Sequence, residues 1–135
     1  MRKTIAMLMG TVLLGATPAW TKPAPDGGTI LAKALDGRVA GEPVDCIRMR
    51  NIRGSRIIPN TGILYEGIDG TLYLNRPDSG AESLRRSDVL VSDVHSGSLC
   101  DIDVVRLFDP ALRTRTGVVF LGKFEPYRRA GRAHH

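Results

Sequence analysis

Two aspartates beside a cysteine are the residues best placed to do chemistry. The segment GSLCDIDVVRLFDP, residues 97–110, puts Asp101 and Asp103 directly after Cys100. If the segment is one strand, alternate side chains share a face and the two carboxylates project together, roughly 7 Å apart. Such a pair can support acid–base catalysis or bind a divalent cation. The alternative is that both face solvent or pair with arginines of a neighbouring strand.

Catalysis at these carboxylates would also need a third ligand or a nucleophile, and a pocket. Asp93, His95 and Asp109 lie nearby in sequence, but no metal-loop or triad spacing links them. The serines form no nucleophile elbow. We therefore expect no catalytic residue, no metal and no cofactor. A small hydrolase or metal-dependent enzyme using Asp101 and Asp103 is the alternative hypothesis.

Four arginines in the stretch RMRNIRGSR form a second candidate site. Arg48, Arg50, Arg53 and Arg56 could bind phosphate, an acidic glycan or another anion. Proteins that bind single-stranded nucleic acids interleave aromatic residues, whereas aromatic residues make up only 5% of this chain and none lies between these arginines. We expect no nucleic-acid binding. A solvated or ion-paired arginine surface is the alternative.

The N-terminus has the three parts of a secretory signal peptide. Arg2 and Lys3 form a basic region, residues 5–16 are apolar, and residues 17–19 supply small side chains at a cleavage site. The apolar run of twelve residues is shorter than the roughly 20 needed to span a bilayer. We predict that residues 1–19 are removed and that the protein is periplasmic or secreted.

Cys46 and Cys100 are the two cysteines of the chain, and export would bring them to an oxidising compartment. A metal site would need three or four ligands, and His95 is the one histidine near either cysteine in sequence. We therefore predict a disulfide. In the chain-entropy model, closing a loop of this length stabilises a fold by about 4 kcal/mol.

The charge that remains after export is mild. Without Arg2 and Lys3 the chain has 17 basic and 14 acidic residues, so its net charge falls from +5 to +3. This charge is compatible with an envelope protein, a glycan or an anionic membrane surface as partner, but it requires none of them.

The length of 135 residues suits one domain. We expect a flexible lead-in over residues 20–28, a single β-rich domain over 29–128 and a flexible basic tail over 129–135. Thr29 is the expected N-cap of a short helix that ends at Gly37. Its apolar face comprises Ile30, Leu31, Ala34 and Leu35.

Short apolar segments separated by turn residues follow the helix. Asp69-Gly70 predicts a hairpin between residues 63–68 and 71–75, and Pro59-Asn60 predicts a turn. Four more strands are expected, over residues 44–52, 89–94, 99–109 and 117–127, with a break at Gly54-Ser55-Arg56 after the first and a hairpin between the second and the third. The pattern predicts a small antiparallel barrel or sandwich of about six strands with one N-terminal helix. An α+β open sheet is the alternative.

The order of these features resembles a family of small exported proteobacterial proteins of unknown function. The resemblance covers residues 44–128 and rests on a cysteine followed by Ile and basic residues, then LYLNRP, LCDIDVVRLFD and FLGKFEPYR. It implies an intact exported domain without an assigned activity. The family often has Gly-Asp after the second cysteine, where this chain has Asp101-Ile102-Asp103.

These observations predict an exported binding or structural module of the cell envelope rather than an enzyme. A related hypothesis is that an exposed strand edge of the domain docks on another chain. The sequence makes no prediction of the oligomeric state.

Overall fold

Antiparallel strands form most of the chain in its computed structural model, which describes residue 10, residues 14–20 and residues 22–131. Most of the predicted signal peptide and residues 132–135 of the predicted tail lie outside the described residues. No helix of the described chain is long and apolar enough to cross a bilayer. The strands are β1 (Arg38–Ala40), β2 (Cys46–Arg48), β3 (Ile52–Ile58), β4 (Gly62–Gly67), β5 (Leu72–Asn75), β6 (Val89–Ser92), β7 (Ser98–Cys100), β8 (Val104–Asp109), β9 (Thr114–Phe120) and β10 (Phe124–Arg129).

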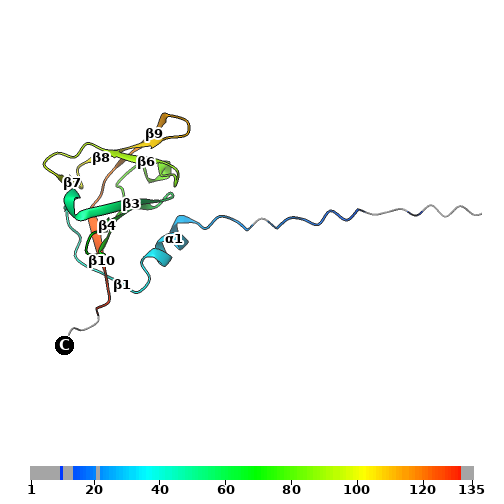
Figure 1. Ribbon diagram of the computed structural model, residues 1–135, viewed down its shortest axis with the longest axis horizontal. Helices are drawn as coiled ribbons and strands as arrows, with labels where there is room; N and C mark the ends of the chain where they lie inside the picture. The colour runs from blue at the N-terminus through cyan, green and yellow to red at the C-terminus, as the bar shows by residue number, and fades with distance from the viewer. Residues whose placement is uncertain (1–9, 11–13, 21, 132–135) are drawn as a thin grey trace, which may run out of the picture.

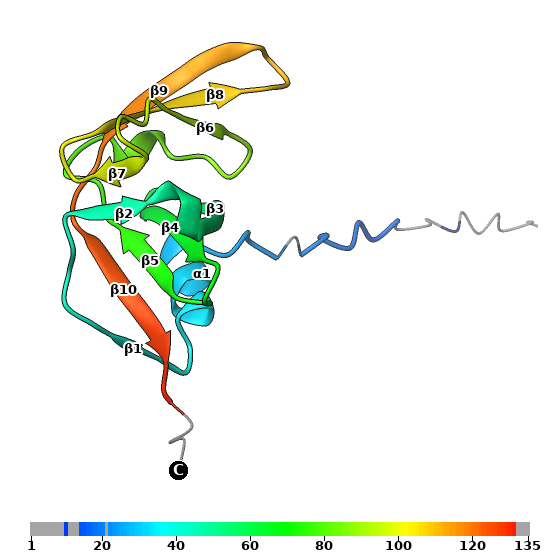
Figure 2. The same cartoon turned by 60° about the vertical axis from the view of Figure 1, so that its left-hand side comes forward.

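These strands form three antiparallel sheets, shown in Figures 1 and 2. The largest has the order β1-β10-β5-β4-β3, the second pairs β2 with β7, and the third has the order β6-β8-β9. Within the described chain no sheet closes into a barrel, so the predicted barrel is not confirmed, whereas a sandwich-like β fold fits. The prediction of a mainly β fold with one N-terminal helix is confirmed.

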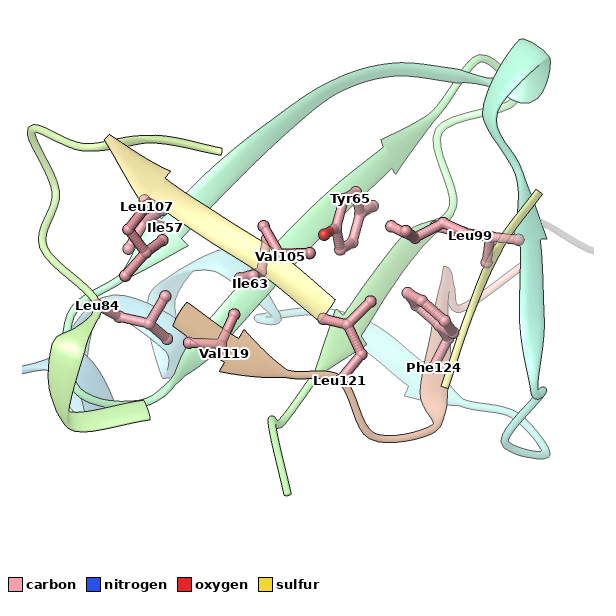
Figure 3. Packing of buried hydrophobic residues seen from close by; sticks show 11 residues of the cluster. Ile57, Ile63, Tyr65, Leu84, Leu99, Val105, Leu107, Val119, Leu121 and Phe124 are labelled. Atoms are coloured by element: carbon pink, nitrogen blue, oxygen red, sulfur yellow. The ribbon is translucent and has the colours of Figure 1, made fainter. Parts of the chain in front are cut away.

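The central strand β4 explains how the layers assemble. Its side chains are buried on both faces, so apolar residues must cover it from both sides. Ile63 and Tyr65 belong to a cluster that includes residues of the two smaller sheets, whereas Leu64 belongs to a cluster under α1 (Gly27–Ala34). Figure 3 shows the first cluster, in which Tyr65 and Phe124 pack edge to face.

The helix was predicted with the correct face but the wrong start. Asp26 is its N-cap, because the Asp26 side chain accepts a 2.8 Å hydrogen bond from the Thr29 backbone N–H. Leu31 is buried, and the other three predicted apolar residues pack in the same cluster. The predicted lead-in is therefore shorter, and α1 begins at Gly27.

The prediction of about six strands was too low because two long segments are divided and because two further strands, β1 and β3, lie mostly outside the predicted segments. The segment predicted over residues 99–109 is divided between β7 and β8, which pair with β2 and with β6 and β9 respectively. Residues 117–127 split at Gly122, where the chain passes from β9 to β10. A Cβ atom at Gly122 would lie 2.4 Å from the Arg76 carbonyl oxygen, so this close passage requires glycine.

The turn signals predicted the pairings that are local in sequence. The hairpin at Asp69-Gly70 and the turn at Pro59-Asn60 are confirmed. The break predicted at Gly54-Ser55-Arg56 was wrong, since β3 continues to Ile58. The short 3-10 helix η1 (Met49–Asn51) interrupts the chain before β3, and a second one, η2 (Ala81–Ser83), precedes β6.

Candidate functional site

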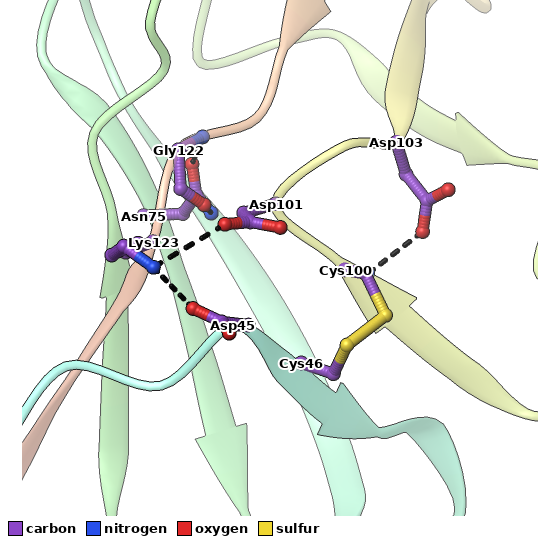
Figure 4. The surroundings of a disulfide bond; sticks show 8 residues. All are labelled: Asp45, Cys46, Asn75, Cys100, Asp101, Asp103, Gly122 and Lys123. Atoms are coloured by element: carbon purple, nitrogen blue, oxygen red, sulfur yellow. Dashed lines mark hydrogen bonds and ion pairs between the residues drawn. A yellow bond between two sulfur atoms is a disulfide. The ribbon is translucent and has the colours of Figure 1, made fainter.

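The predicted disulfide between Cys46 and Cys100 is confirmed, as Figure 4 shows. The two cysteines are directly opposed in the β2–β7 pair, 54 residues apart in sequence. In the next pair of the register, Ile47 and Leu99 point into the core, where both are buried. The disulfide therefore ties the two strands from outside while the neighbouring residues anchor them inside.

Asp101 and Asp103 do not share a strand face, because residues 101–103 form a turn rather than a strand. The Asp103 carboxylate accepts a 2.7 Å hydrogen bond from the Cys100 backbone N–H. The Asp101 carboxylate lies 3.6 Å from the Lys123 ammonium, which also forms an ion pair with Asp45. Figure 4 shows the two carboxylates directed at these different neighbours. Both are thus placed to hold the turn beside the disulfide.

The Lys123 ammonium is the centre of that small charged group. Its pKa is raised by the hydrogen bond and charge of Asp45, and further by Asp101. Lys123 lies between β9 and β10, whereas Asp45 precedes β2, so the ion pair joins distant parts of the chain. Among the described residues, no cluster of three or more His, Cys, Asp or Glu side chains is placed to hold a metal ion.

The four predicted arginines occupy three different elements. Arg48 ends β2 and lines an open hollow of about 490 Å³, and Arg50 is exposed in η1. Arg53 and Arg56 are both exposed on β3. Arg53 occupies an irregular position, because the register with β4 shifts between Ile52 and Gly54.

Arg53 forms an ion pair with Glu66 on the adjacent strand β4. The hydrogen bond and charge of Arg53 lower the pKa of Glu66, and the charges of Arg56 and Arg38 lower it further. Both partners are well exposed, so this pair contributes little to stability. The charge of Arg53 is therefore largely balanced, whereas Arg56 forms no ion pair with a described carboxylate.

β3 is an end strand of the five-stranded sheet, and its outer edge has no partner strand in the described chain. Residues 53–56 are exposed along it. Ser55 and Arg56 line two hollows: one of about 340 Å³ shared with α1 and Arg38, and one of about 360 Å³ shared with β6. Solvent therefore reaches Ser55 and Arg56 of β3 from two directions, through the hollow beside α1 and through the hollow beside β6.

The second hollow separates two sheet edges, because β6 is an end strand of the three-stranded sheet. Figure 1 shows β6 above β3, and residues of both strands line the hollow. Its lining includes Arg86, which forms no ion pair with a described carboxylate, and Asp88. We call this hollow, lined by Ser55, Arg56, Ile57, Arg86, Asp88, Val89 and Leu90, the edge groove.

The sequence and the structure were compared with those of known proteins. No family model, curated protein or solved structure matches the chain. The edge groove must therefore be interpreted from its own residues.

Asp88 is the most unusual residue of the edge groove. It is only 8% exposed, and its Oδ2 accepts a 2.7 Å hydrogen bond from the Thr116 hydroxyl. Its Oδ1 is buried and has no hydrogen-bond partner. A buried acceptor without a donor is unfavourable, so Asp88 is a costly residue to keep at this position.

Sequence reasoning found Arg56 but missed Arg86 and Asp88. The segment that contains them, DSGAESLRRSD, is polar and was expected only to form a loop. A carboxylate followed directly by the apolar strand VLV was the available signal, since such a residue can be drawn into the protein with that strand.

Proposed function

We propose that this protein is an exported binding module of the cell envelope, and that it holds an extended, acidic segment of another polypeptide along the free edge of β3. The observation that carries the proposal is the edge groove, in which the free edge of β3 lies beside Arg56 and Arg86, which form no ion pair with a described carboxylate.

The backbone supports an extended ligand. An end strand presents N–H and C=O groups that can pair with an added strand, a mode of peptide recognition known as β-augmentation. β3 has seven residues, the joint-longest strand of the described chain, and three of them line the edge groove opposite four residues in and before β6. At about 3.4 Å per residue, a ligand segment of three or four residues would fill the groove.

The charges support an acidic ligand. Arg56 and Arg86 are the groove's two cations, and a guanidinium binds a carboxylate with two parallel hydrogen bonds. Asp88 is the groove's single carboxylate, but it is only 8% exposed, whereas Arg56 and Arg86 are both exposed. The positive charges of the groove are therefore more accessible to a ligand than its negative charge.

The envelope location rests on three further observations. The predicted signal peptide would export the chain, and the disulfide fits an oxidising compartment. The resemblance to small exported proteobacterial proteins favours the same location. A sandwich-like arrangement of open sheets also suits a binding role, because it leaves strand edges free where a closed barrel would not.

A random-peptide display selection against the chain purified from the periplasm of an expression host tests this function. We expect the enriched sequences to contain acidic residues at alternate positions and no central proline, because proline cannot donate to β3. Arg56→Glu and Arg86→Glu should each abolish binding of these peptides, whereas the control Arg50→Glu, in the same arginine stretch but in η1, should not. Failure to enrich any peptide, or equal binding by all three variants, would contradict the proposal.

A further inference from the structure

The hollow of about 490 Å³ beside β2 lies between two layers of the fold and shares no lining residue with the edge groove. Figure 2 shows β2 above β5 and β10, and residues of all three strands line the hollow. Its two walls are formed by side chains from β2 to the start of β3 and by side chains of β5 and β10. We call it the β2 pocket and define it by Arg48, Asn51 and Ile52 on one wall and Tyr73, Pro126 and Arg128 on the other.

The second wall of the β2 pocket continues the core face of the five-stranded sheet. Alternate residues of a strand share a face, so Pro126 and Arg128 lie on the same side of β10 as Phe124, which is in the main core. Pro126 is opposite Tyr73 of β5 in the register, and Tyr73 packs partly buried against that core. The apolar face of the sheet therefore extends beyond the core into the pocket, where it ends at the exposed Arg128.

The first wall is held in place on both sides of Arg48. Arg48 ends β2, which pairs with β7 and is tied to it by the disulfide. Arg48 is opposite Ser98 in that pair, and the N–H of the following residue, Met49, donates a 2.9 Å hydrogen bond to the Gly97 carbonyl. Because this backbone is already ordered, binding of a ligand by Arg48 does not first have to order a loop.

The charges of the β2 pocket favour a singly charged anion. Neither Arg48 nor Arg128 forms an ion pair with a described carboxylate. Glu42 is the one acidic residue of the lining, so two positive charges and one negative charge leave a net charge of +1. Arg128 lowers the pKa of Asp69, but Asp69 lies outside the lining and its carboxylate accepts hydrogen bonds from Thr71. Both guanidinium groups thus remain open to a ligand.

The remaining side chains determine what the anion is attached to. A guanidinium binds a carboxylate with two parallel hydrogen bonds, and a carboxylate carries the single charge that the pocket lacks. Tyr73 and Ile52 are partly buried and offer an aromatic and an aliphatic contact surface. A volume of about 490 Å³ lies within the range of small-molecule sites, which combine apolar walls with a few polar groups.

From these observations we infer that the β2 pocket binds a small organic carboxylate, with its carboxylate held by Arg48 and Arg128 and an apolar ring packed against Tyr73. The inference goes beyond the proposed peptide site and gives the protein a second, separate ligand. Because the pocket is open to solvent and Glu42 offsets one of its cations, we expect binding of a one-ring carboxylate to be weak, with a dissociation constant on the order of 1 mM.

Titration of the chain purified from the periplasm with benzoate, followed by ¹H–¹⁵N nuclear magnetic resonance, tests this site. Benzamide has the same ring without the charge, and acetate has the charge without the ring. We expect each of them, and inorganic phosphate, to bind at least about tenfold more weakly than benzoate. The backbone amide signals that move should include those of Arg48, Tyr73 and Arg128.

Two matched pairs of variants assign the binding to the two arginines. Arg48→Gln and Arg128→Gln should each weaken benzoate binding at least about tenfold. Their controls are Arg50→Gln and Arg129→Gln, which remove exposed arginines from the same two segments but outside the lining, and should leave the affinity unaltered. All four positions are exposed, and far-UV circular dichroism checks that each variant is folded.

Glu42→Gln gives a change of opposite sign. Removal of the pocket's one carboxylate should strengthen benzoate binding by about threefold, because it removes a like charge. Glu82→Gln, at an exposed position outside the lining, is the control and should have no effect.

Absence of benzoate binding up to about 100 mM, or equal losses in Arg48→Gln and Arg50→Gln, would overturn the site. Phosphate or acetate that binds as tightly as benzoate would overturn the assignment of its ligand. The peptide-binding function fails separately, since Arg56→Glu and Arg86→Glu should not change benzoate binding. A chain that binds selected peptides but no benzoate contradicts only the β2 pocket, and the reverse result contradicts only the edge-groove function.

Discussion

Asn75 and Gly122 exchange two hydrogen bonds although they lie 47 residues apart in sequence. The Asn75 Nδ2 donates to the Gly122 carbonyl at 2.6 Å, and the Gly122 N–H donates to the Asn75 Oδ1 at 3.0 Å. Asn75 is fully buried, so its side chain serves as a substitute backbone partner for the turn between β9 and β10. This contact fixes where the chain leaves the three-stranded sheet and enters the five-stranded one.

Replacing Asn75 with Leu should therefore destabilise the fold. The change removes both hydrogen bonds and leaves a buried N–H and a buried carbonyl of Gly122 without partners, which we expect to lower the free energy of unfolding by about 2–4 kcal/mol. Urea unfolding followed by circular dichroism measures it. Asn51→Leu, at an exposed position, is the control. A loss below about 1 kcal/mol for Asn75→Leu would show that water or a rearranged turn satisfies Gly122.

Gly122→Ala should also destabilise the protein, for a steric reason. The added Cβ would lie 2.4 Å from the Arg76 carbonyl oxygen and 3.1 Å from the Asp78 carboxylate, so the backbone must move. We expect a fall in the thermal unfolding midpoint of several degrees. Gly131→Ala, where a Cβ would meet nothing within 4 Å, should leave the midpoint unchanged. Equal midpoints for the two variants would contradict this account of the turn.

The disulfide should contribute strongly to stability because it closes a loop of 54 residues. Reduction, or the double change Cys46→Ala with Cys100→Ala, should lower the free energy of unfolding by about 4 kcal/mol in the chain-entropy model. Denaturant unfolding with and without reductant measures the loss. The double variant should not respond to the reductant, and a wild type equally stable in both conditions would contradict the prediction.

Tyr65 should make the protein sensitive to alkaline pH. Burial raises the pKa of its phenol above the ordinary value, and its hydroxyl has no hydrogen-bond partner. Above about pH 10 the unfolded chain releases this proton while the folded chain keeps it, so stability falls by up to about 1.4 kcal/mol per pH unit. Tyr65→Phe should reduce that slope and change stability at pH 7 by less than about 1 kcal/mol.

Unfolding measured from pH 7 to 11 separates these effects. A smaller slope of the same sign should remain in Tyr65→Phe, because partial burial and a hydrogen bond with Glu125 also raise the pKa of Tyr127. An unchanged slope in Tyr65→Phe would contradict the role of Tyr65.

The sequence predicted what short-range signals control. Asp69-Gly70 specified a hairpin because turn residues fix a register between adjacent segments, and the spacing of Leu31 and its neighbours specified the helix face. The division at residues 101–103 was not predictable in the same way. It depends on Asp103 folding back onto Cys100 and on β7 and β8 having different partner strands.

The candidate site was predictable only in part for the same reason. Arg56 stood out by its place in an arginine-rich stretch, and the two cysteines by their number and expected compartment. The edge groove, however, arises where the ends of two sheets approach each other, and Asp88 becomes buried only in that context. Neither property follows from the spacing of residues within one segment.

Hydrogen–deuterium exchange, measured with and without the best peptide from the display selection, tests the central claim most directly. If the peptide adds a strand to β3, the amides of residues 53–58 and 86–92 should exchange more slowly in the complex, while those of β1 should not change. Protection confined to β8 and β9, or absent from residues 53–58, would contradict binding along the edge of β3.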